Sequence, residues 1–406
     1  MDDALAPIDV LSEAQRILKL ARTDKRAAEQ ALAALELPVQ VAIVCEAPAA
    51  LRAKILGMLP EPEAAIPMLP EGEFVFSVKA VGLDDSSWIL EHATPRQLAS
   101  CFDLDAWNGL DPDRASLAHW FAVIAEAGEE TLLRATHAID PEVLALHLRS
   151  KVQVMLDPKN EEWQAPIGAQ TLEGQFYFMA RNEGDDIAPL VQLLHALFRE
   201  DYWLYFRMMQ SVMWELETEL EESSLRWRTG RLADLGFPSW EDSMRVYGHL
   251  RPELRTVLAE QVTHAPISEW DLPVWLPNLP AVAQNDHSLF RTVFELDEHD
   301  RRAFFYSFVA LANKVAVADR MPLGDAETLP KAIEKAATFA SSGLEHIAEA
   351  NTTGLVDVLS RTTLEYMFRV GASLDPEAAH PPPLHSDDDG TDEESNGAGP
   401  SVVTHR

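Results

Sequence analysis

Cysteine is nearly absent from this sequence, in which only Cys45 and Cys101 occur among 406 residues. Two cysteines cannot build the disulfide framework of a small secreted protein, and such low usage is typical of a reducing compartment. Cys45 lies within the apolar stretch VAIVCEAP, and Cys101 directly precedes Phe102. We therefore expect both side chains to be buried and neither to act as a nucleophile.

Positive charge is scarce as well. Lysine and arginine number 33 against 66 aspartates and glutamates, which gives a formal net charge of -33. A field of this sign repels the phosphates of nucleic acids and of anionic lipids. Binding to either would need a strongly segregated basic face, so the composition predicts a protein with no nucleic-acid partner and no membrane partner.

Targeting signals and membrane-spanning runs are missing from the sequence. The N-terminal residues MDDALAPID contain neither the basic region nor the apolar core of a signal peptide. The longest apolar stretch, 303–318, includes Asn313 and Lys314 and, at about 16 residues, is too short for a bilayer span. We expect this stretch to form a buried helix, and we expect a soluble, cytoplasmic protein.

The common catalytic signatures are also absent from the sequence. It contains no G-x-S-x-G, P-loop or G-x-G-x-x-G motif, and no pair of residues with H-E-x-x-H or C-x-x-C spacing. His299-Asp300 before an expected helix resembles the metal-binding pair of HD-type phosphohydrolases, with Asp319 as the last ligand. That class needs a longer gap than the 19 residues between these aspartates. We therefore expect Asp297 or Asp300 to cap the helix, and we predict no catalytic residue, no metal and no cofactor.

Helix-start signals and helical spacing of apolar residues recur along the chain. Thr94-Pro95-Arg96-Gln97 is a capping box with proline at the first helical position. Asp111-Pro112 and Asp140-Pro141 repeat the order of cap and proline. The amphipathic segments between these signals are short and can bury their apolar faces only by stacking on one another. The sequence therefore predicts an all-α fold, an irregular array of short stacked helices.

Two segments depart from the helical pattern. Residues 151–156 (KVQVML) alternate weakly between apolar and polar side chains, and residues 174–180 (GQFYFMA) are rich in aromatic residues. Pro158, Pro166 and Gly168 lie between them. This combination predicts one small β-hairpin.

The middle of the chain, 187–229, has the pattern of a continuous helix with a break near Asp201. Gly230 has the residue type that commonly ends a helix. We therefore predict a short turn over 231–235, closed by Gly236, because Pro238 prevents the helix from continuing.

Changes in composition divide the chain into six parts. Residues 264–288 contain four prolines and two tryptophans, which predicts an ordered loop packed on the body. From Asp375 onward, the stretches PPP, DDDG, DEES and NGAGPS cannot bury enough apolar surface to fold. The predicted parts are a helical array (1–150), a β-hairpin insertion (151–186), a central helical segment (187–263), a proline-rich ordered loop (264–288), C-terminal helices (289–374) and a disordered acidic tail (375–406).

Arg226, Trp227, Arg228 and Arg231, called here the arginine cluster, are the most concentrated group of cations in this acidic sequence. Guanidinium groups suit bidentate oxyanions, and an indole ring offers a stacking face. The cluster could therefore bind a phosphate, a carboxylate or an acidic peptide. Internal pairing is the alternative, because Glu222 and Arg226 lie four residues apart and cations complement the dipole at a helix C-terminus. The cluster is our candidate ligand-binding site, and the sequence leaves both roles open.

Four stretches resemble an uncharacterised bacterial family, domain of unknown function 6178. They are ATPRQLASCFDLDAW (93–107), RWRTGRLADLGFPSWEDSMRVY (226–247), LANKVAVADRMPLGD (311–325) and YMFRVGASL (366–374). The resemblance implies a soluble, mostly helical protein and supplies no activity, cofactor or catalytic residue. The N-terminal third also resembles the helical cytosolic domain of magnesium transporters, through the rhythm of Leu59-Pro60 and Leu69-Pro70. No membrane domain follows, so transport is not implied.

Two functions fit these observations. The first is a non-enzymatic interaction or scaffold protein with unidentified protein partners, favoured by the stacked helices and the missing catalytic constellation. The second is a small-anion or nucleotide sensor or enzyme that uses Arg226, Arg228 and Arg231. A pocket with unpaired guanidinium groups would favour the second function, whereas pairing of these groups with Glu219 or Glu222 would exclude it.

Overall fold

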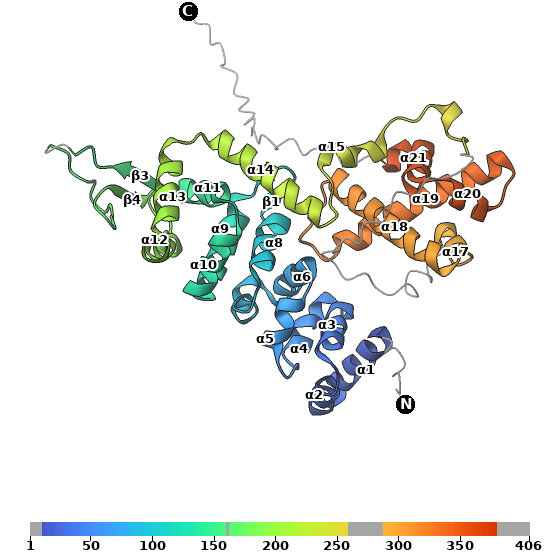
Figure 1. The fold of residues 1–406 in the computed structure, drawn as a ribbon, viewed down its shortest axis with the longest axis horizontal. Helices are drawn as coiled ribbons and strands as arrows, with labels where there is room; N and C mark the ends of the chain where they lie inside the picture. Colours follow the sequence, from blue (N-terminus) through green and yellow to red (C-terminus); the bar gives the residue numbers. More distant parts are fainter. Residues whose placement is uncertain (1–9, 160–161, 259–286, 380–406) are drawn as a thin grey trace, which may run out of the picture.

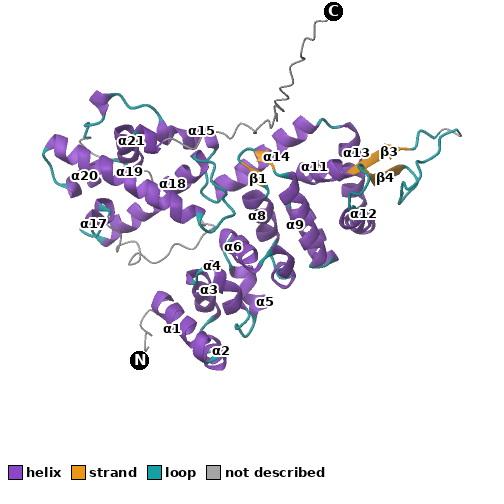
Figure 2. Cartoon of the chain, turned by 180° about the vertical axis from the view of Figure 1, so that it is seen from behind, coloured by secondary structure: helices purple, strands orange, loops and turns teal. Residues whose placement is uncertain are grey.

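The structure, a computed structural model, describes residues 10–159, 162–258 and 287–379. Its elements are almost all helices, and its sheets are small and two-stranded. Figure 1 shows three groups of helices that meet at a central junction, and the view from behind shows the same arrangement (Figure 2). The predicted all-α fold of irregularly stacked short helices is therefore confirmed.

The first group is a column of short helices that leads from the N-terminal side of the chain to the junction (Figure 1). It contains α1 (Val10–Thr23), α2 (Lys25–Ala33), α3 (Leu37–Glu46), α4 (Ala49–Leu56), α5 (Pro62–Ala65), α6 (Glu71–Val81), α7 (Ser87–Leu90) and α8 (Pro95–Asp105). The capping box at Thr94 is formed, and the Gln97 side chain also donates hydrogen bonds of 2.8 Å to two carbonyl oxygens of an earlier turn. Cys45 and Cys101 are buried, as expected, and burial raises the pKa of both thiols.

The second group carries the longer hairpin. It contains α9 (Arg114–Glu126), α10 (Glu129–Ala138), α11 (Pro141–Lys151), β3 (Val152–Leu156), β4 (Phe176–Ala180), α12 (Ala188–Glu200) and α13 (Tyr202–Trp214). β3 follows α11 directly and pairs antiparallel with β4, with Val152 opposite Ala180. The predicted hairpin is therefore confirmed. The predicted break at Asp201 is confirmed as well, because the Asp201 carboxylate caps α13 by accepting a hydrogen bond from the Leu204 amide.

A second, shorter hairpin lies where the sequence predicted the start of a helix. β1 (Trp107–Asn108) pairs antiparallel with β2 (Asp111–Pro112). The prediction that Asp111-Pro112 begins a helix is therefore wrong, and α9 is capped by Asp113 instead. Gly109 accounts for the difference, because its φ of 63° opens the two-residue turn 109–110 that a tight hairpin requires.

α14 (Glu217–Asp234) runs from the second group to the junction (Figure 1). The helix predicted over 187–229 is interrupted at Glu215 and Leu216 as well as at Asp201, and the prediction that Gly230 ends it is wrong. Gly230 stays helical, and the chain turns only at Gly236, where φ is 84°. α14 therefore carries both Arg228 and Arg231, three residues apart on one side of the helix.

The third group is formed by the C-terminal helices. It contains α15 (Trp240–Ser243), α17 (Ser288–Val293), α18 (Glu298–Ala318), α19 (Thr328–Asn351), α20 (Leu355–Arg361), α21 (Leu364–Leu374) and α22 (Pro376–Ala379). The apolar stretch 303–318 forms most of α18, as expected, and Asp297 caps this helix by accepting a hydrogen bond of 2.9 Å from the Asp300 amide. Among the helices described, none combines the length and the apolar character needed to cross a membrane.

Single 3-10 turns join several of these helices. They are η1 (Ile66–Met68), η2 (Leu83–Asp85), η3 (Met244–Tyr247) and η4 (Pro252–Leu254). Two predicted parts of the chain lie mostly outside the described residues. The proline-rich loop over 264–288 is described only at its last two residues, and the predicted tail only at 375–379. Within that tail, Pro376–Ala379 form α22 and Ala379 is buried, so the predicted disorder does not begin at Asp375.

His147 is a buried titratable group in the core of the second group. Its side chain is 4% exposed, and its ring stacks on Phe121 with 4.4 Å between ring centroids. The Nδ1 atom has no hydrogen-bond partner among the described residues. Burial, with smaller contributions from the positive charges of Lys151 and Arg114, lowers the pKa of His147 to about 3. The imidazole is therefore neutral in the folded protein at neutral pH.

We predict that His147 makes the protein sensitive to mild acid. The unfolded chain protonates this histidine below about pH 6.5 while the folded protein does not, so stability present above that pH is lost as the pH falls toward 3. For each pH unit below about 6, the wild type should lose roughly 1.4 kcal/mol more unfolding free energy than a His147→Phe variant. Urea denaturation of both proteins between about pH 4.5 and 7 measures the difference. Parallel pH profiles for the two proteins would contradict the prediction.

Candidate functional site

The residues of the arginine cluster do not share one surface. Arg226 and Trp227 lie on the outer side of α14, where the Trp227 side chain is 52% exposed and the Arg226 guanidinium lies 5.9 Å from the centroid of its ring. Glu222 and Arg226, both among the described residues, do not form the ion pair that was considered from the sequence. Arg228 and Arg231 point toward the interior instead. The structure thus separates the cluster into an outer pair and an inner pair.

The Arg231 guanidinium pairs with two aspartates that are distant in the sequence. Its guanidinium donates hydrogen bonds of 2.7 and 2.8 Å to the carboxylate of Asp103 in α8, and of 2.6 and 2.7 Å to Asp140 at the start of α11. Burial alone would lower the pKa of Arg231, but the hydrogen bonds to both carboxylates outweigh it and raise the pKa. Arg231 therefore ties α14 to the first and second groups and uses four of its five N–H donors on these two carboxylates.

Arg228 is buried, and no carboxylate of the described residues binds its guanidinium directly. Its Nε donates a hydrogen bond of 2.8 Å to the carbonyl oxygen of Asp103, and its Nη1 one of 3.3 Å to that of Gly109. The guanidinium carbon lies 4.8 Å from the ring centroid of Trp107. Burial lowers the pKa of Arg228 to about 10, against the opposing influence of the Asp103 carboxylate. The positive charge is retained at neutral pH, in an environment that compensates it incompletely.

A second arginine, Arg320, approaches the same place from the C-terminal group. It lies two residues beyond the end of α18, after Asp319, and has a φ of 52°, in the left-handed region that favours glycine. The Arg320 amide donates to the Val317 carbonyl and the next amide to the Ala316 carbonyl, which is the Schellman ending of a helix. The Arg320 guanidinium lies 4.8 Å from the ring centroid of Trp240 and forms no ion pair with any described residue. Arg320 thus has a backbone conformation that costs less free energy for glycine than for a residue with a side chain.

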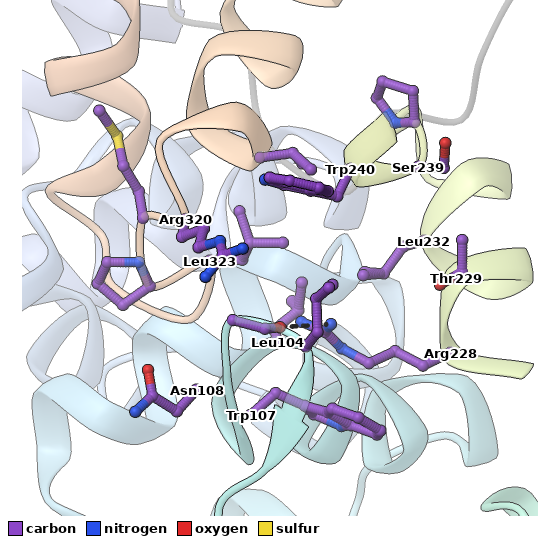
Figure 3. A pocket seen from close by; sticks show the side chains of 16 residues that line it. Leu104, Trp107, Asn108, Arg228, Thr229, Leu232, Ser239, Trp240, Arg320 and Leu323 are labelled. Atoms are coloured by element: carbon purple, nitrogen blue, oxygen red, sulfur yellow. Dashed lines mark hydrogen bonds between the residues drawn. The ribbon is translucent and has the colours of Figure 1, made fainter. Parts of the chain in front are cut away.

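These residues line a pocket of about 330 Å³ at the junction of the three groups. Figure 3 shows Arg228 and Arg320 reaching into it from opposite sides, each beside the face of a tryptophan. Its wall is formed by residues 104–110 at the end of α8 and the short hairpin, 228–232 of α14, 238–240 before and at the start of α15, and 317–323 at the end of α18. The pocket therefore combines two guanidinium groups with apolar side chains from four separate segments.

Unused hydrogen-bonding capacity adds to this arrangement. The Nε1 atom of Trp240 is buried without a partner among the described residues, and the Asn108 side chain lies in the pocket wall (Figure 3). Leu104, Leu232 and Leu323 supply apolar wall. Buried polar groups without partners are uncommon in folded proteins and are often satisfied by water or a ligand. The wall is suited to a molecule with an anionic group and a small apolar part.

Glycines allow the close approach of the segments around the pocket. A Cβ at Gly324, in the turn after Arg320, would lie 2.8 Å from the Cβ of Asp105 at the end of α8. A Cβ at Gly109 would lie 3.5 Å from the Cδ atom of Arg320. Both positions place the end of α18 directly against the short hairpin. The position of Arg320 is therefore set by contacts with residues more than 200 positions earlier in the chain.

The residues of the metal-binding pattern considered from the sequence belong to a helix start and to a hydrogen-bond network. Asp297 caps α18, and Asp319 accepts hydrogen bonds of 2.8 Å from the Tyr247 hydroxyl and 2.6 Å from the Lys335 ammonium group. Within the described ranges, no group of three or more histidine, cysteine, aspartate or glutamate side chains is placed to hold a metal ion. The HD-type arrangement is therefore not found in this part of the molecule.

Sequence reasoning singled out Arg228 but missed Arg320, Trp107 and Trp240. One local signal was available, because Pro322 two residues after Arg320 marks the end of a helix. The residue pair Gly109-Leu110 likewise fits a tight hairpin turn with glycine first. Neither signal shows that these segments meet, because the pairing of Arg320 with Trp240 depends on how α15 packs against α18.

A model of a family of unknown function (DUF6178) matches residues 29–378 of the chain. The match includes every segment of the pocket wall. Three of the stretches that resemble the family, 93–107, 226–247 and 311–325, supply most of this wall. No curated protein and no solved structure matches the chain.

Proposed function

This chain belongs to the family of unknown function DUF6178, and from the chemistry at its junction we propose that it binds a small organic anion in the pocket between α8, α14 and α18. The volume, about 330 Å³, lies at the small end of the range of ligand pockets, about 300–1,000 Å³. The ligand class we propose carries a phosphate or carboxylate group on a compact body.

The observation that carries the proposal is a pair of arginines that have no carboxylate partner among the residues that the structure describes. Arg228 and Arg320 enter the pocket from opposite sides (Figure 3), and each guanidinium lies against an indole ring. Such contact holds the flat face of the group and leaves in-plane N–H donors for oxygen atoms of a ligand. Hydrogen bonds between guanidinium and oxyanion groups are among the strongest available to a protein, and partial burial strengthens them.

The charge balance at the junction supports an anion rather than a cation. Arg228, Arg231 and Arg320 are three positive charges, whereas Asp103 and Asp140 are two negative charges, both paired with Arg231. One positive charge therefore remains in a protein whose formal net charge is -33. An anion that enters the pocket passes through a repulsive outer field, so we expect binding to strengthen as salt screens that field.

Thermal denaturation and calorimetric titration with four anions test the proposal. We would use inorganic phosphate, pyrophosphate, adenosine monophosphate and citrate, which differ in charge and in apolar area. A ligand present at about 100 times its Kd stabilises the native state by about 2.7 kcal/mol. If none of the four raises the Tm of the wild-type protein or releases heat on titration, the proposed function is wrong.

Replacement of Arg320 by glycine separates binding from folding. Glycine adopts a φ of 52° without the cost that other residues bear, which offsets the lost contact with Trp240. We expect the unfolding free energy of Arg320→Gly to stay within about 1 kcal/mol of the wild-type value. The affinity for the best of the four anions should fall by about tenfold or more, because one of two guanidinium groups is lost.

The matched control is Arg226→Ala, which removes an exposed arginine on the outer side of α14. This variant should bind the anion as the wild type does. Equal affinity of Arg320→Gly and wild type would show that the anion binds elsewhere. The interaction or scaffold role predicted from the sequence is a separate proposal.

A further inference from the structure

α13 presents two tryptophan side chains to solvent on one face, with Arg207 and Gln210 between them. Trp203 is 76% exposed and Trp214 is 56% exposed, and Leu216, just beyond the helix end, is 60% exposed. Trp203 and Trp214 lie eleven residues apart, which is close to three full turns, so both indoles point to the same side of α13. The opposite side, with Tyr205 and Met208 among others, is buried. We call the exposed Trp203, Trp214 and Leu216, together with the half-buried Phe206, the α13 stripe.

The two exposed indoles of the α13 stripe pack against aromatic rings on their core-facing side. Phe206 lies between Trp203 and the core, with centroid distances of 6.4 Å to Trp203 and 5.5 Å to the buried Phe176 of β4. The Trp214 ring makes an edge contact of 6.5 Å with the same Phe176. The two exposed indoles are thus held against a fixed aromatic base, which lowers the entropy cost of using them as contacts. Their spacing along the helix axis is roughly 16 Å.

Carboxylates border the C-terminal end of the stripe. Five glutamates occur between residues 215 and 222, and two of them, Glu217 and Glu221, bind Arg114. Glu219 and Glu222 have no ion-pair partner in the described part of the chain. The arginine on this side of α13, Arg207, is paired with Glu142 at 3.4 Å. Unpaired charge beside the apolar stripe is therefore negative.

We propose that the α13 stripe binds an amphipathic helix of another protein, with its apolar face on the two indoles and lysine or arginine side chains against Glu219 and Glu222. An amphipathic helix buries apolar residues at intervals of three and four along one side, which suits two anchors on a straight ridge. Exposed tryptophans of this kind are the residues that most often dominate binding energy at protein interfaces. The charge of the border selects a basic partner.

The same charges argue against two other occupants. A second copy of this chain carries the same net charge of -33 and the same acidic border, and repulsion between like charges opposes association. An anionic lipid surface would be repelled by this border and by the net charge of -33. A basic helix satisfies both the apolar stripe and the carboxylates beside it.

Three labelled synthetic peptides of about five helical turns test this proposal by fluorescence anisotropy. The first has leucine on one face and lysine on the other, the second has the same composition in scrambled order, and the third has glutamate in place of lysine. We expect the first peptide to bind at least about tenfold more tightly than the scrambled one. We expect no measurable binding of the third, because its charges match those of the border. Equal affinity for the first two peptides would overturn the proposal, since it would show attraction by net charge alone.

Variants locate the binding surface. The double variant Trp203→Ala/Trp214→Ala should weaken binding of the first peptide by about tenfold or more, whereas Trp227→Ala, which removes an exposed indole elsewhere, should leave it unchanged. Glu219→Gln/Glu222→Gln should weaken it by about threefold and reduce its salt dependence. Unchanged binding by the double tryptophan variant would overturn the proposal. Dimerisation of the wild type that this variant abolishes would also overturn it, in favour of self-association.

Discussion

Replacement of Gly343 by alanine should strongly destabilise the C-terminal group of helices. Gly343 in α19 and Gly371 in α21 face each other where these helices cross, and the ring contact of Phe339 with Phe368 lies beside them. A Cβ on Gly343 would overlap the carbonyl group of Met367, and one on Gly371 would overlap that of Phe339. Both obstacles are backbone atoms, so the helices themselves must separate. We expect a loss of unfolding free energy at or above the upper end of the usual overpacking range, about 3 kcal/mol or more.

A glycine in another helix provides the matched control. Gly230 lies inside α14, and a Cβ there would meet no atom within 4 Å. Gly230→Ala should therefore stabilise the protein by about 0.5–1 kcal/mol, because alanine favours a helix more than glycine does. Urea denaturation followed by circular dichroism measures both variants. If Gly343→Ala and Gly230→Ala shift the midpoint in the same direction, the close crossing of α19 and α21 is not as described here.

Arg231→Met should cost about 3–5 kcal/mol of unfolding free energy. The substitution preserves much of the side-chain volume but leaves Asp103 and Asp140 without their partner. Their side chains are only 5% and 11% exposed, so water cannot replace the four lost hydrogen bonds. Because Asp103 belongs to α8 and Asp140 to the start of α11, we expect the loss to affect the contact of α14 with both groups. Chemical denaturation monitored by tryptophan fluorescence provides the measurement.

Two further variants establish the cause. Arg226→Met, on the outer side of the same helix, should change stability by less than about 0.5 kcal/mol. Addition of Asp103→Asn and Asp140→Asn to Arg231→Met should recover part of the loss, because neutral amides are less costly than uncompensated carboxylates in a buried site. A loss below about 1 kcal/mol for Arg231→Met, or no recovery in the triple variant, would contradict a role for this network in stability.

Local signals predicted those parts of the fold that depend on neighbouring residues. Thr94 with Gln97, Asp201 and Asp297 each cap a helix through hydrogen bonds that span three residues. The hairpin of β3 and β4 was visible in its alternation and aromatic residues. Predictions failed where tertiary contacts outweighed a local preference. Gly230 was expected to end the helix, but it stays helical and α14 extends to Asp234. This extension places Arg231 next to the two aspartates that it binds.

The candidate site was only partly predictable for the same reason. The arginine cluster was chosen because it concentrates positive charge. In the structure Arg226 is exposed to solvent, Arg231 pairs with two aspartates, and Arg228 lines the pocket. Arg228 is the one cluster residue in the pocket wall, and the second pocket arginine, Arg320, comes from a segment that shows no concentration of charge. The glutamates considered as internal partners are near in the sequence, whereas Arg231 binds aspartates 128 and 91 residues away.

The sequence by itself determined the helical class, most helix starts, the longer hairpin and the acidic character of this protein. These properties follow from backbone preferences, short-range hydrogen bonds and a sum of charges. None of the three depends on contacts between residues that are distant in the sequence. Only the tertiary structure decided that Gly343 lies opposite Gly371, that Arg231 binds Asp103 and Asp140, and that Arg228 and Arg320 line one pocket. Each of these contacts joins residues far apart in the chain, and its existence depends on packing angles that no local pattern specifies.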